Sequence, residues 1–242
     1  MFHNPNLFKK IYDTCRIYLI RLGRNVMNSN KLRKHFITNI NFAMISETKN
    51  PNTLFRTWLN EAEKLEINNY NAMNLATVGS NGRPSSRMVL LKGYDENGFV
   101  IYTNYESRKG QEILNHGFCA LCFHWKSLKR QVRIEGEIIS VTNEEANKYF
   151  STRDRRSQIS AWASKQSQPL PNRAEFEERI KQYEEKFKNL EQVPRPPHWS
   201  GFRVIADKLE FWQEMPYRQH DRVVYKRSEI DKGDWDIERL YP

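Results

Sequence analysis

The stretch AMNLATVGSNGRPSSRMVLLKGYDENGFVIYTN, residues 72–104, decides the fold class. It contains three strand-like runs separated by two turn sequences that each end in Asn-Gly. The runs are Ala72–Val78, Ser86–Tyr94 and Phe99–Asn104, and the turns are residues 79–82 and 95–98. Asn-Gly between alternating apolar segments favours antiparallel hairpins, so this stretch predicts a meander of short strands.

Outward from this meander, helices alternate with further strands. Asn50–Glu66 carries apolar residues at helical spacing, and Ser107 is placed to cap a short helix that stops at Gly117. Two more helices are expected at Asn143–Thr152 and Arg173–Leu190, the latter followed by a rigid proline-rich connector, VPRPPHW. The remaining strands expected are Phe118–Trp125, Gln131–Val141, Phe202–Ala206, Leu209–Gln213, Arg222–Lys226 and Trp235–Leu240. The predicted fold class is mainly β with flanking helices (α+β), arranged as a small β-barrel.

Composition excludes several classes of protein. The chain has 242 residues, of which 38% are hydrophobic and 28% charged, and no apolar run is long enough to span a membrane. Cys119 and Cys122 are three positions apart on an expected strand, so their side chains face opposite ways and predict neither a metal nor a redox pair. We expect no metal site.

The net charge of +10 is concentrated near the N-terminus, where residues 1–50 contain nine Lys/Arg and two acidic residues. We therefore expect two regions, a basic extension over residues 1–50 and a nearly neutral body over residues 51–242. Residues 1–31 fit a mitochondrial-type presequence, a nucleic-acid-binding arm or, most simply, a frayed extension.

Four cationic clusters in the body are candidates for binding anions. Arg87 and Lys92 end an otherwise apolar strand, which predicts burial and anionic partners. Ser107-Arg108-Lys109 opens a helix, where free N–H groups and cations favour phosphate. Tyr149, Arg153 and Ser157 follow at i, i+4 and i+8, and Arg218, His220 and Arg222 alternate as on an extended strand. Together they predict that the body binds one or two small phosphorylated ligands; the alternative is a set of solvated charges and ordinary ion pairs.

The order and spacing of several motifs strongly resemble the pyridoxamine 5′-phosphate oxidase family from about residue 51 to Pro242. These motifs are R-M-V-L-L-K, Y-T-N-Y-E-S-R-K, R-Q-V-R-I-E-G, Y-F-S-T-R, A-W-A-S-K-Q-S and E-F-W-Q followed by R-x-H-D-R and R-L-Y-P. The resemblance implies an FMN-binding split β-barrel that forms a homodimer. It implies oxidation of pyridoxamine or pyridoxine 5′-phosphate by O₂ to pyridoxal 5′-phosphate, with release of hydrogen peroxide.

The resemblance also implies roles for individual residues. Those implied to bind FMN are Arg87, Met88, Val89, Leu90, Leu91, Lys92, Tyr102, Thr103, Arg108, Lys109, Gln131, Gln166, Ser167, Trp212 and Arg222. Those implied to bind the substrate are Lys92, Tyr149, Arg153, Ser157, Arg218, Gln219 and His220, with Arg33 and Phe36 from a covering segment. Arg218 and His220 are the implied catalytic pair.

The chain departs from the family pattern in four places. Gln219 stands where leucine is typical, Phe36 replaces a tyrosine, and Asn69 stands where an aspartate is expected. Between Trp212 and Arg218 the sequence Q-E-M-P-Y replaces a glycine-containing segment.

Two alternatives stay open at this point: a related split-barrel flavoprotein with another substrate, and a basic nucleic-acid-binding protein. The residues favour the oxidase, with no nucleic-acid or membrane partner. The expected location is cytoplasmic, or mitochondrial if the basic leader is a targeting signal.

Overall fold

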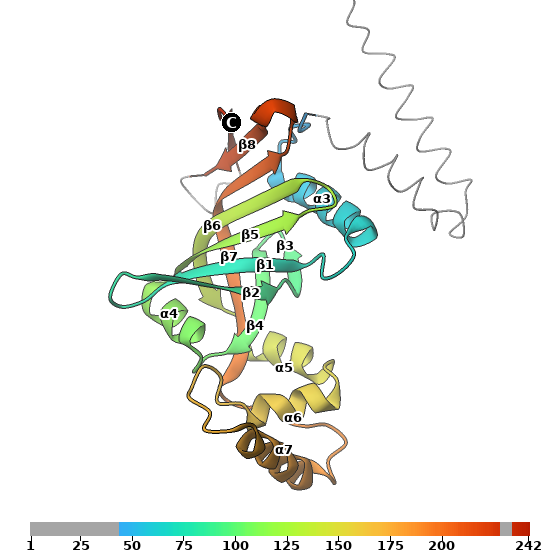
Figure 1. The fold of residues 1–242 in the computed structure, drawn as a ribbon, viewed down its shortest axis with the longest axis vertical. Helices are drawn as coiled ribbons and strands as arrows, with labels where there is room; N and C mark the ends of the chain where they lie inside the picture. Colours follow the sequence, from blue (N-terminus) through green and yellow to red (C-terminus); the bar gives the residue numbers. More distant parts are fainter. Residues whose placement is uncertain (1–43, 228–233) are drawn as a thin grey trace, which may run out of the picture. The chain divides into compact units, whose positions relative to one another are not determined.

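The computed structural model describes residues 44–227 and 234–242, which belong to one compact unit, Met44–Pro242. Arg33, Phe36 and the basic leader over residues 1–31 lie outside the described residues. Nine strands form one antiparallel sheet in the order β2-β1-β5-β6-β7-β4-β3, with β8 paired to β7 and β9 to β8 (Figure 1). The strands are β1 (Ala72–Val78), β2 (Pro84–Leu90), β3 (Gly93–Asp95), β4 (Gly98–Asn104), β5 (Phe118–Trp125), β6 (Arg130–Ser140), β7 (Trp199–Gln213), β8 (Asp221–Lys226) and β9 (Asp236–Arg239).

Helices flank this curled sheet. They are α3 (Pro51–Leu65), α4 (Arg108–His116), α5 (Asn143–Ser151), α6 (Arg155–Ala163), α7 (Arg173–Phe187) and the 3₁₀ turn η1 (Pro216–Arg218). The predicted class, mainly β with flanking helices, is confirmed.

The bounds of several elements follow from local sequence signals alone. Strands β1 and β5 have the predicted bounds. Ser107 caps α4 by accepting a hydrogen bond from the Gly110 N–H, and Gly117 ends the helix in the left-handed region with φ 68°. Cys119 and Cys122 lie on opposite faces of β5, as predicted; Cys119 is buried, whereas Cys122 is only partly buried.

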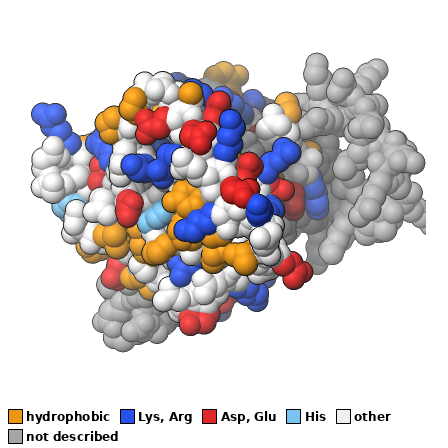
Figure 2. Space-filling view, turned by 90° about the horizontal axis from the view of Figure 1, so that it is seen from below, with side chains coloured by type: hydrophobic (Ala, Val, Ile, Leu, Met, Phe, Trp, Pro, Cys, Tyr) orange, Lys and Arg blue, Asp and Glu red, His pale blue; other side chains and the backbone are white. Residues whose placement is uncertain are grey.

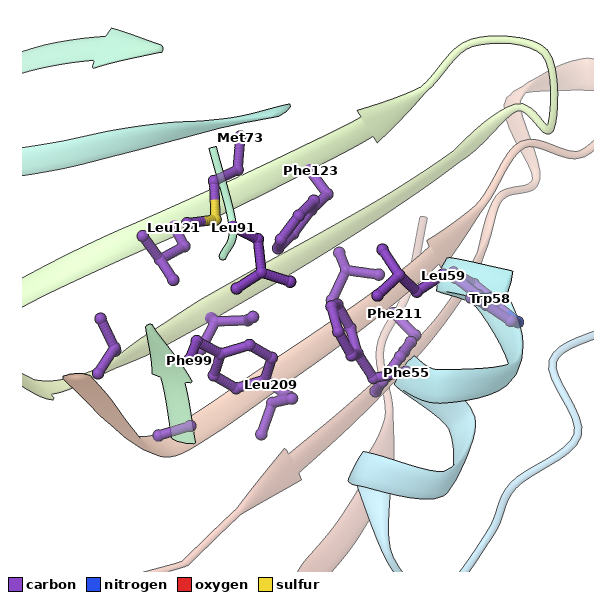
Figure 3. Packing of buried hydrophobic residues seen from close by; sticks show 14 of the residues in the cluster. Phe55, Trp58, Leu59, Met73, Leu91, Phe99, Leu121, Phe123, Leu209 and Phe211 are labelled. Carbon is purple, nitrogen blue, oxygen red and sulfur yellow. The ribbon is translucent and has the colours of Figure 1, made fainter. Parts of the chain in front are cut away.

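The core lies between α3 and the concave face of the sheet (Figure 3). Phe55 is fully buried and meets Phe99 and Phe123 edge-on, with ring centroids 5.0 and 5.4 Å apart. Such edge-to-face contacts add to the apolar burial that fixes α3 on the sheet. The sheet is therefore a rigid support for the side chains at its two ends.

Strand β7 is longer than the sequence suggests. The predicted strands Phe202–Ala206 and Leu209–Gln213 are one continuous strand, because Asp207 is accommodated as a bulge opposite Glu135 and Gly136. A Cβ at Gly136 would lie 2.1 Å from the Ile205 carbonyl oxygen, so the bulge requires glycine there. Along its other edge, the first half of β7 pairs with β4 and the second half pairs with β8. Strand β7 therefore connects the part of the sheet that contains β4 to the part that contains β8.

The predicted strand Ser86–Tyr94 was wrong in two respects. It is broken after Leu90, and β3 starts at Gly93. Strand β2 is also an edge strand and not a buried one: Met88 is 64% exposed and Leu90 37% exposed. Alternate residues of an edge strand with one covered face point outward, so an apolar run did not imply burial here.

Two absences hold for the described part of the chain. No helix there is long and apolar enough to cross a membrane. No group of three or more His, Cys, Asp or Glu side chains there could hold a metal ion.

Candidate cofactor and substrate site

A cationic cluster gathers where the start of α4 meets β1, β2 and the end of β4. Arg87 on β2 and Arg108 on α4 both pair with the buried Glu112, at 3.2 and 2.8 Å. Lys109 donates to Thr103 Oγ1 at 3.1 Å and to Gln166 Oε1 at 2.9 Å. We call Arg87, Arg108, Lys109 and Glu112, with Thr103 and Gln166, the α4 cluster. Its described residues carry three cations and one carboxylate.

Lys109 has no carboxylate partner among the described residues of this cluster. Its described hydrogen-bond partners are neutral oxygens, since the three acceptors are Thr103, Ser107 and Gln166. Burial, and next the charge of Arg87, lower the pKa of Lys109. Cations held together at a helix start with an excess of positive charge fit a phosphate monoester, which carries close to two negative charges at neutral pH. The residues present therefore fit the phosphate of FMN.

Glu112 is a functional residue that the sequence reasoning missed. Its carboxylate also accepts from Thr77 Oγ1 at 2.5 Å and Ser85 Oγ at 2.6 Å. Burial alone would raise the pKa of Glu112, but the hydrogen bonds from Ser85, Thr77 and Arg108 outweigh it and hold the pKa at about 2. The i, i+4 spacing to Arg108 was the one signal that could have identified Glu112.

We expect Glu112 to stabilise the fold in a pH-dependent way. Its folded pKa of about 2 is below the ordinary 4.5, so its stabilisation is complete above pH 4.5 and disappears as the pH falls to about 2. Urea unfolding of wild type and Glu112→Gln should give free energies of unfolding that differ most above pH 4.5 and converge near pH 2. A constant difference between the two proteins over that range would contradict this.

A second cluster, which we call the aromatic cluster, consists of Tyr102, Tyr149, Arg153 and Trp199. Helix α5, which carries Tyr149, lies beside β4 (Figure 1). The ring of Tyr102 stacks on that of Tyr149 with centroids 4.0 Å apart, and Trp199 extends the stack at 5.4 Å from Tyr102. The Arg153 guanidinium lies 4.7 Å from the Trp199 ring centre. Tyr102 and Thr103 are consecutive in β4, so the aromatic cluster and the α4 cluster occupy opposite faces of one strand.

The prediction that Tyr149, Arg153 and Ser157 share one helical face was wrong. Helix α5 ends at Ser151, and Asp154 caps a separate helix, α6, by accepting from the Arg156 N–H at 2.9 Å. An aspartate that satisfies a helix start competes with continuation of the preceding helix. Arg153 therefore lies in the connection between the two helices. Ser157 lies in the first turn of α6, half-buried.

A third cluster lies at the far end of β7. Trp212 is opposite Gln131 on β6 and Arg222 on β8, and its ring contacts that of His220 at 4.6 Å between centroids. Arg222 pairs with the buried Glu210 at 2.8 Å, a second carboxylate that the sequence reasoning missed. No sequence signal indicated it, because this contact is made across two strands.

The expected extended alternation of Arg218, His220 and Arg222 was also wrong. Tyr217 and Arg218 have φ values of 58° and 62°, and β8 begins only at Asp221. The short turn after Pro216 imposes this left-handed backbone, which is costly for residues other than glycine and is concentrated at functional sites. Arg218 is exposed, and the His220 Nδ1 accepts from the Met215 N–H at 3.3 Å.

The remaining predicted residues lie as follows. Lys92 is exposed between β2 and β3, with no side-chain partner among the described residues. Val89 packs against the core and Leu91 is buried within it. Ser167 and Gln219 are exposed, Ser167 with φ 71°.

One copy of the chain does not bring all these residues together. Trp199 and Trp212 end a strand that rises about 3.3 Å per residue, so they lie roughly 40 Å apart along it. The α4 and aromatic clusters are at one end of β7, and His220, Arg218 and Arg222 are at the other. A site that uses both ends needs a second copy of the chain.

The curled antiparallel sheet, its flanking helices and the cationic clusters at its ends define a split-barrel protein. Residues 59–212 match the family model described as pyridoxamine 5′-phosphate oxidase, and residues 199–242 match a model described as the pyridoxine 5′-phosphate oxidase C-terminal dimerisation region. The chain belongs to the pyridoxamine 5′-phosphate oxidase family.

Relatives and solved structures agree with this assignment. The chain is 52% identical over 205 residues to the pyridoxine/pyridoxamine 5′-phosphate oxidase of Mesorhizobium japonicum, covering 85% of this chain and 98% of that one. It is 51% identical over 197 residues to the Brucella ovis protein of the same name, covering 81% and 94%. PhzG from Burkholderia lata, solved with tetrahydrophenazine-1-carboxylic acid, superposes with a TM-score of 0.76 at 28% identity, covering 84% of this chain and 100% of PhzG. An FMN-binding protein from Nostoc punctiforme shares the fold, with a TM-score of 0.61 at 18% identity and coverage of 78% and 96%.

Proposed function

We propose that this protein is an FMN-dependent oxidase that converts pyridoxine or pyridoxamine 5′-phosphate to pyridoxal 5′-phosphate. The observation that carries the proposal is that the α4 cluster and the aromatic cluster, on opposite faces of β4, each contain a cation without an anionic partner among the described residues. One contains Lys109 with no described carboxylate partner, and the other contains Arg153 with a buried, unpartnered Nη1 among the described residues. Two phosphates, one from cofactor and one from substrate, match these two clusters, and family membership supports the same reading.

Residues of the α4 cluster would hold the FMN phosphate. Arg87 and Arg108 are fixed by Glu112, so their guanidiniums are already oriented, and Lys109 adds a third cation. The other residues proposed to line FMN are Met88, Val89, Leu90, Leu91, Lys92, Tyr102, Thr103, Gln131, Gln166, Ser167, Trp212 and Arg222. FMN held by these residues would supply the redox chemistry, namely hydride acceptance from the substrate and electron transfer to O₂.

Residues of the aromatic cluster would hold the substrate phosphate. Arg153 offers the unpartnered Nη1, Tyr149 a phenol and Ser157 a hydroxyl, and Lys92 is proposed to add a cation. Arg218 and His220 would contact the pyridine ring near C4′ and orient the carbon that loses hydride, with Gln219 between them. Arg33 and Phe36, outside the described residues, remain predicted covering residues.

A homodimer would bring the two ends of β7 into one site. The match to a C-terminal dimerisation region supports this, and so do the exposed apolar side chains of Met88 and Leu90 on the edge strand β2 and of Phe118 at the start of β5. In the dimer, Arg218 and His220 of one copy would meet Arg153 of the other.

The proposed reaction balances as follows. C4′ of pyridoxine 5′-phosphate loses one hydride and its hydroxyl loses one proton, giving the aldehyde, while O₂ gains two electrons and two protons to become hydrogen peroxide. With pyridoxamine 5′-phosphate the first product is an imine, and one water molecule hydrolyses it to the aldehyde and ammonia.

The direct test mixes purified protein, FMN and pyridoxine 5′-phosphate in air. We expect equal amounts of aldehyde, measured by absorbance, and hydrogen peroxide, measured with a coupled peroxidase. The protein should be yellow and have twice the chain mass. Absence of both products with FMN bound would contradict the proposal.

The nucleic-acid alternative has less support. Figure 2 shows Lys/Arg and Asp/Glu side chains interspersed on the displayed face, where no continuous basic surface is seen. Most of the excess positive charge lies in residues 1–50, so salt-sensitive nucleic-acid binding that persists after their removal would revive this alternative. The cytoplasmic location remains a prediction.

A further inference from the structure

We infer that Trp199 is a positioning residue for the substrate phosphate, because its indole lies against the Arg153 guanidinium, whose Nη1 has no hydrogen-bond partner among the described residues. This inference rests on the proposed function. Trp199 is 7% exposed and is outside the set of residues that the sequence resemblance assigned to the site.

Trp199 is itself rigidly held. Its ring lies nearly parallel to those of Tyr102 and Tyr149, with interplanar angles of 5° and 4°. A Cβ on Gly201 would come within 2.7 Å of the Tyr102 ring, so the glycine makes room for the stack. The Trp199 carbonyl accepts from Arg195 Nη1 at 2.6 Å, which ties the proline-rich connector to the start of β7.

Arg153 depends on this stack for its orientation. It lies between α5 and α6, so no helix fixes its side chain. Its guanidinium carbon is 4.7 Å from the Trp199 ring centre and 5.6 Å from that of Phe150. Burial lowers the pKa of Arg153, although the phenol of Tyr149 partly opposes this.

One donor of the Arg153 guanidinium has no hydrogen-bond acceptor among the described residues. Its Nη1 is buried and has no hydrogen-bond partner among the described residues. A buried unsatisfied donor is costly, and a charged one more so. Guanidinium N–H bonds lie in the plane of the group, so the contact with the indole does not use them, and Nη1 would donate to the phosphate.

The test compares Trp199→Leu and Trp199→Phe with wild type. We expect Trp199→Leu to raise the KM for pyridoxine 5′-phosphate about tenfold while kcat changes less than about threefold, because a desolvated cation–π contact is worth roughly a factor of ten or more. Trp199→Phe keeps an aromatic face and should recover most of the loss. The Kd for pyridoxal 5′-phosphate, read from the perturbed flavin spectrum, should rise in parallel with KM.

A double-mutant cycle separates positioning from general packing. In an Arg153→Ala background, Trp199→Leu should change KM less than about twofold, because the group it positions is gone. Trp235→Leu is the matched control: it removes an indole 4.5 Å from the Arg227 guanidinium, in the C-terminal segment before β9, and should leave KM unchanged. Unfolding temperatures of all variants check that each is folded.

Three outcomes would overturn the inference. They are an unchanged KM in Trp199→Leu, an equal loss with and without Arg153, and an equal loss for pyridoxine 5′-phosphate and unphosphorylated pyridoxine. Each of these requires an active wild type, whereas an inactive wild type would instead contradict the proposed function.

Discussion

Arg218→Ala should retain bound flavin while turnover falls about 100-fold or more, as expected when a charged group in a closed site contacts the reacting part of the substrate. Arg218 lies outside the α4 cluster that is proposed to hold the FMN phosphate, so its loss should not release the cofactor. Its left-handed backbone places it at the end of a tight turn with its side chain exposed in a single copy. The measurements are kcat per bound flavin and the flavin content of the purified variant.

Arg83→Ala provides the control for Arg218→Ala. Arg83 is also an exposed arginine next to a turn, and its side chain has no partner among the described residues. It should keep wild-type turnover. If Arg218→Ala lost its flavin but kept its turnover per bound flavin, the proposed role of Arg218 would be wrong.

Lys109→Met should weaken FMN binding by about 10- to 100-fold and leave riboflavin binding unchanged, because riboflavin lacks the phosphate that Lys109 is proposed to contact. Lys109 has neutral described partners, so its removal leaves no buried carboxylate unpaired, in contrast to removal of Arg87. Flavin fluorescence quenching gives both Kd values for each protein.

Lys64→Met is the matched control, because Lys64 is exposed near the end of α3, far along the chain from the α4 cluster. An equal loss of FMN and riboflavin affinity in Lys109→Met would indicate a general disturbance of the site and contradict a phosphate contact. A wild type that binds neither flavin would instead remove the basis for the proposed cofactor.

The cationic motifs in the sequence did not reveal the buried carboxylates of Glu112 and Glu210, which orient the arginines. Arg87 was expected to need an anionic partner, and Glu112 is that partner. The same carboxylate also holds Arg108, and Glu210 similarly holds Arg222. A phosphate bound there would meet arginines already oriented by the protein, which would lower the entropy lost on binding.

Sequence by itself determined the elements whose signals are local. The turns around Asn-Gly, the caps Ser107 and Gly117, and the alternation along β1 and β5 each depend on neighbouring residues in the chain, so they could be predicted. The ordered motifs likewise identified the family. In each case the information lies within about ten consecutive residues or in their order.

Tertiary structure alone decided the features that depend on contacts between distant residues. These are the exposure of the edge strand β2, the bulge that makes β7 continuous, the separation of α5 from α6, and the stack of Trp199 under Arg153. Burial and side-chain direction depend on which strands and helices become neighbours, and the spacing of residues along one segment does not contain that information.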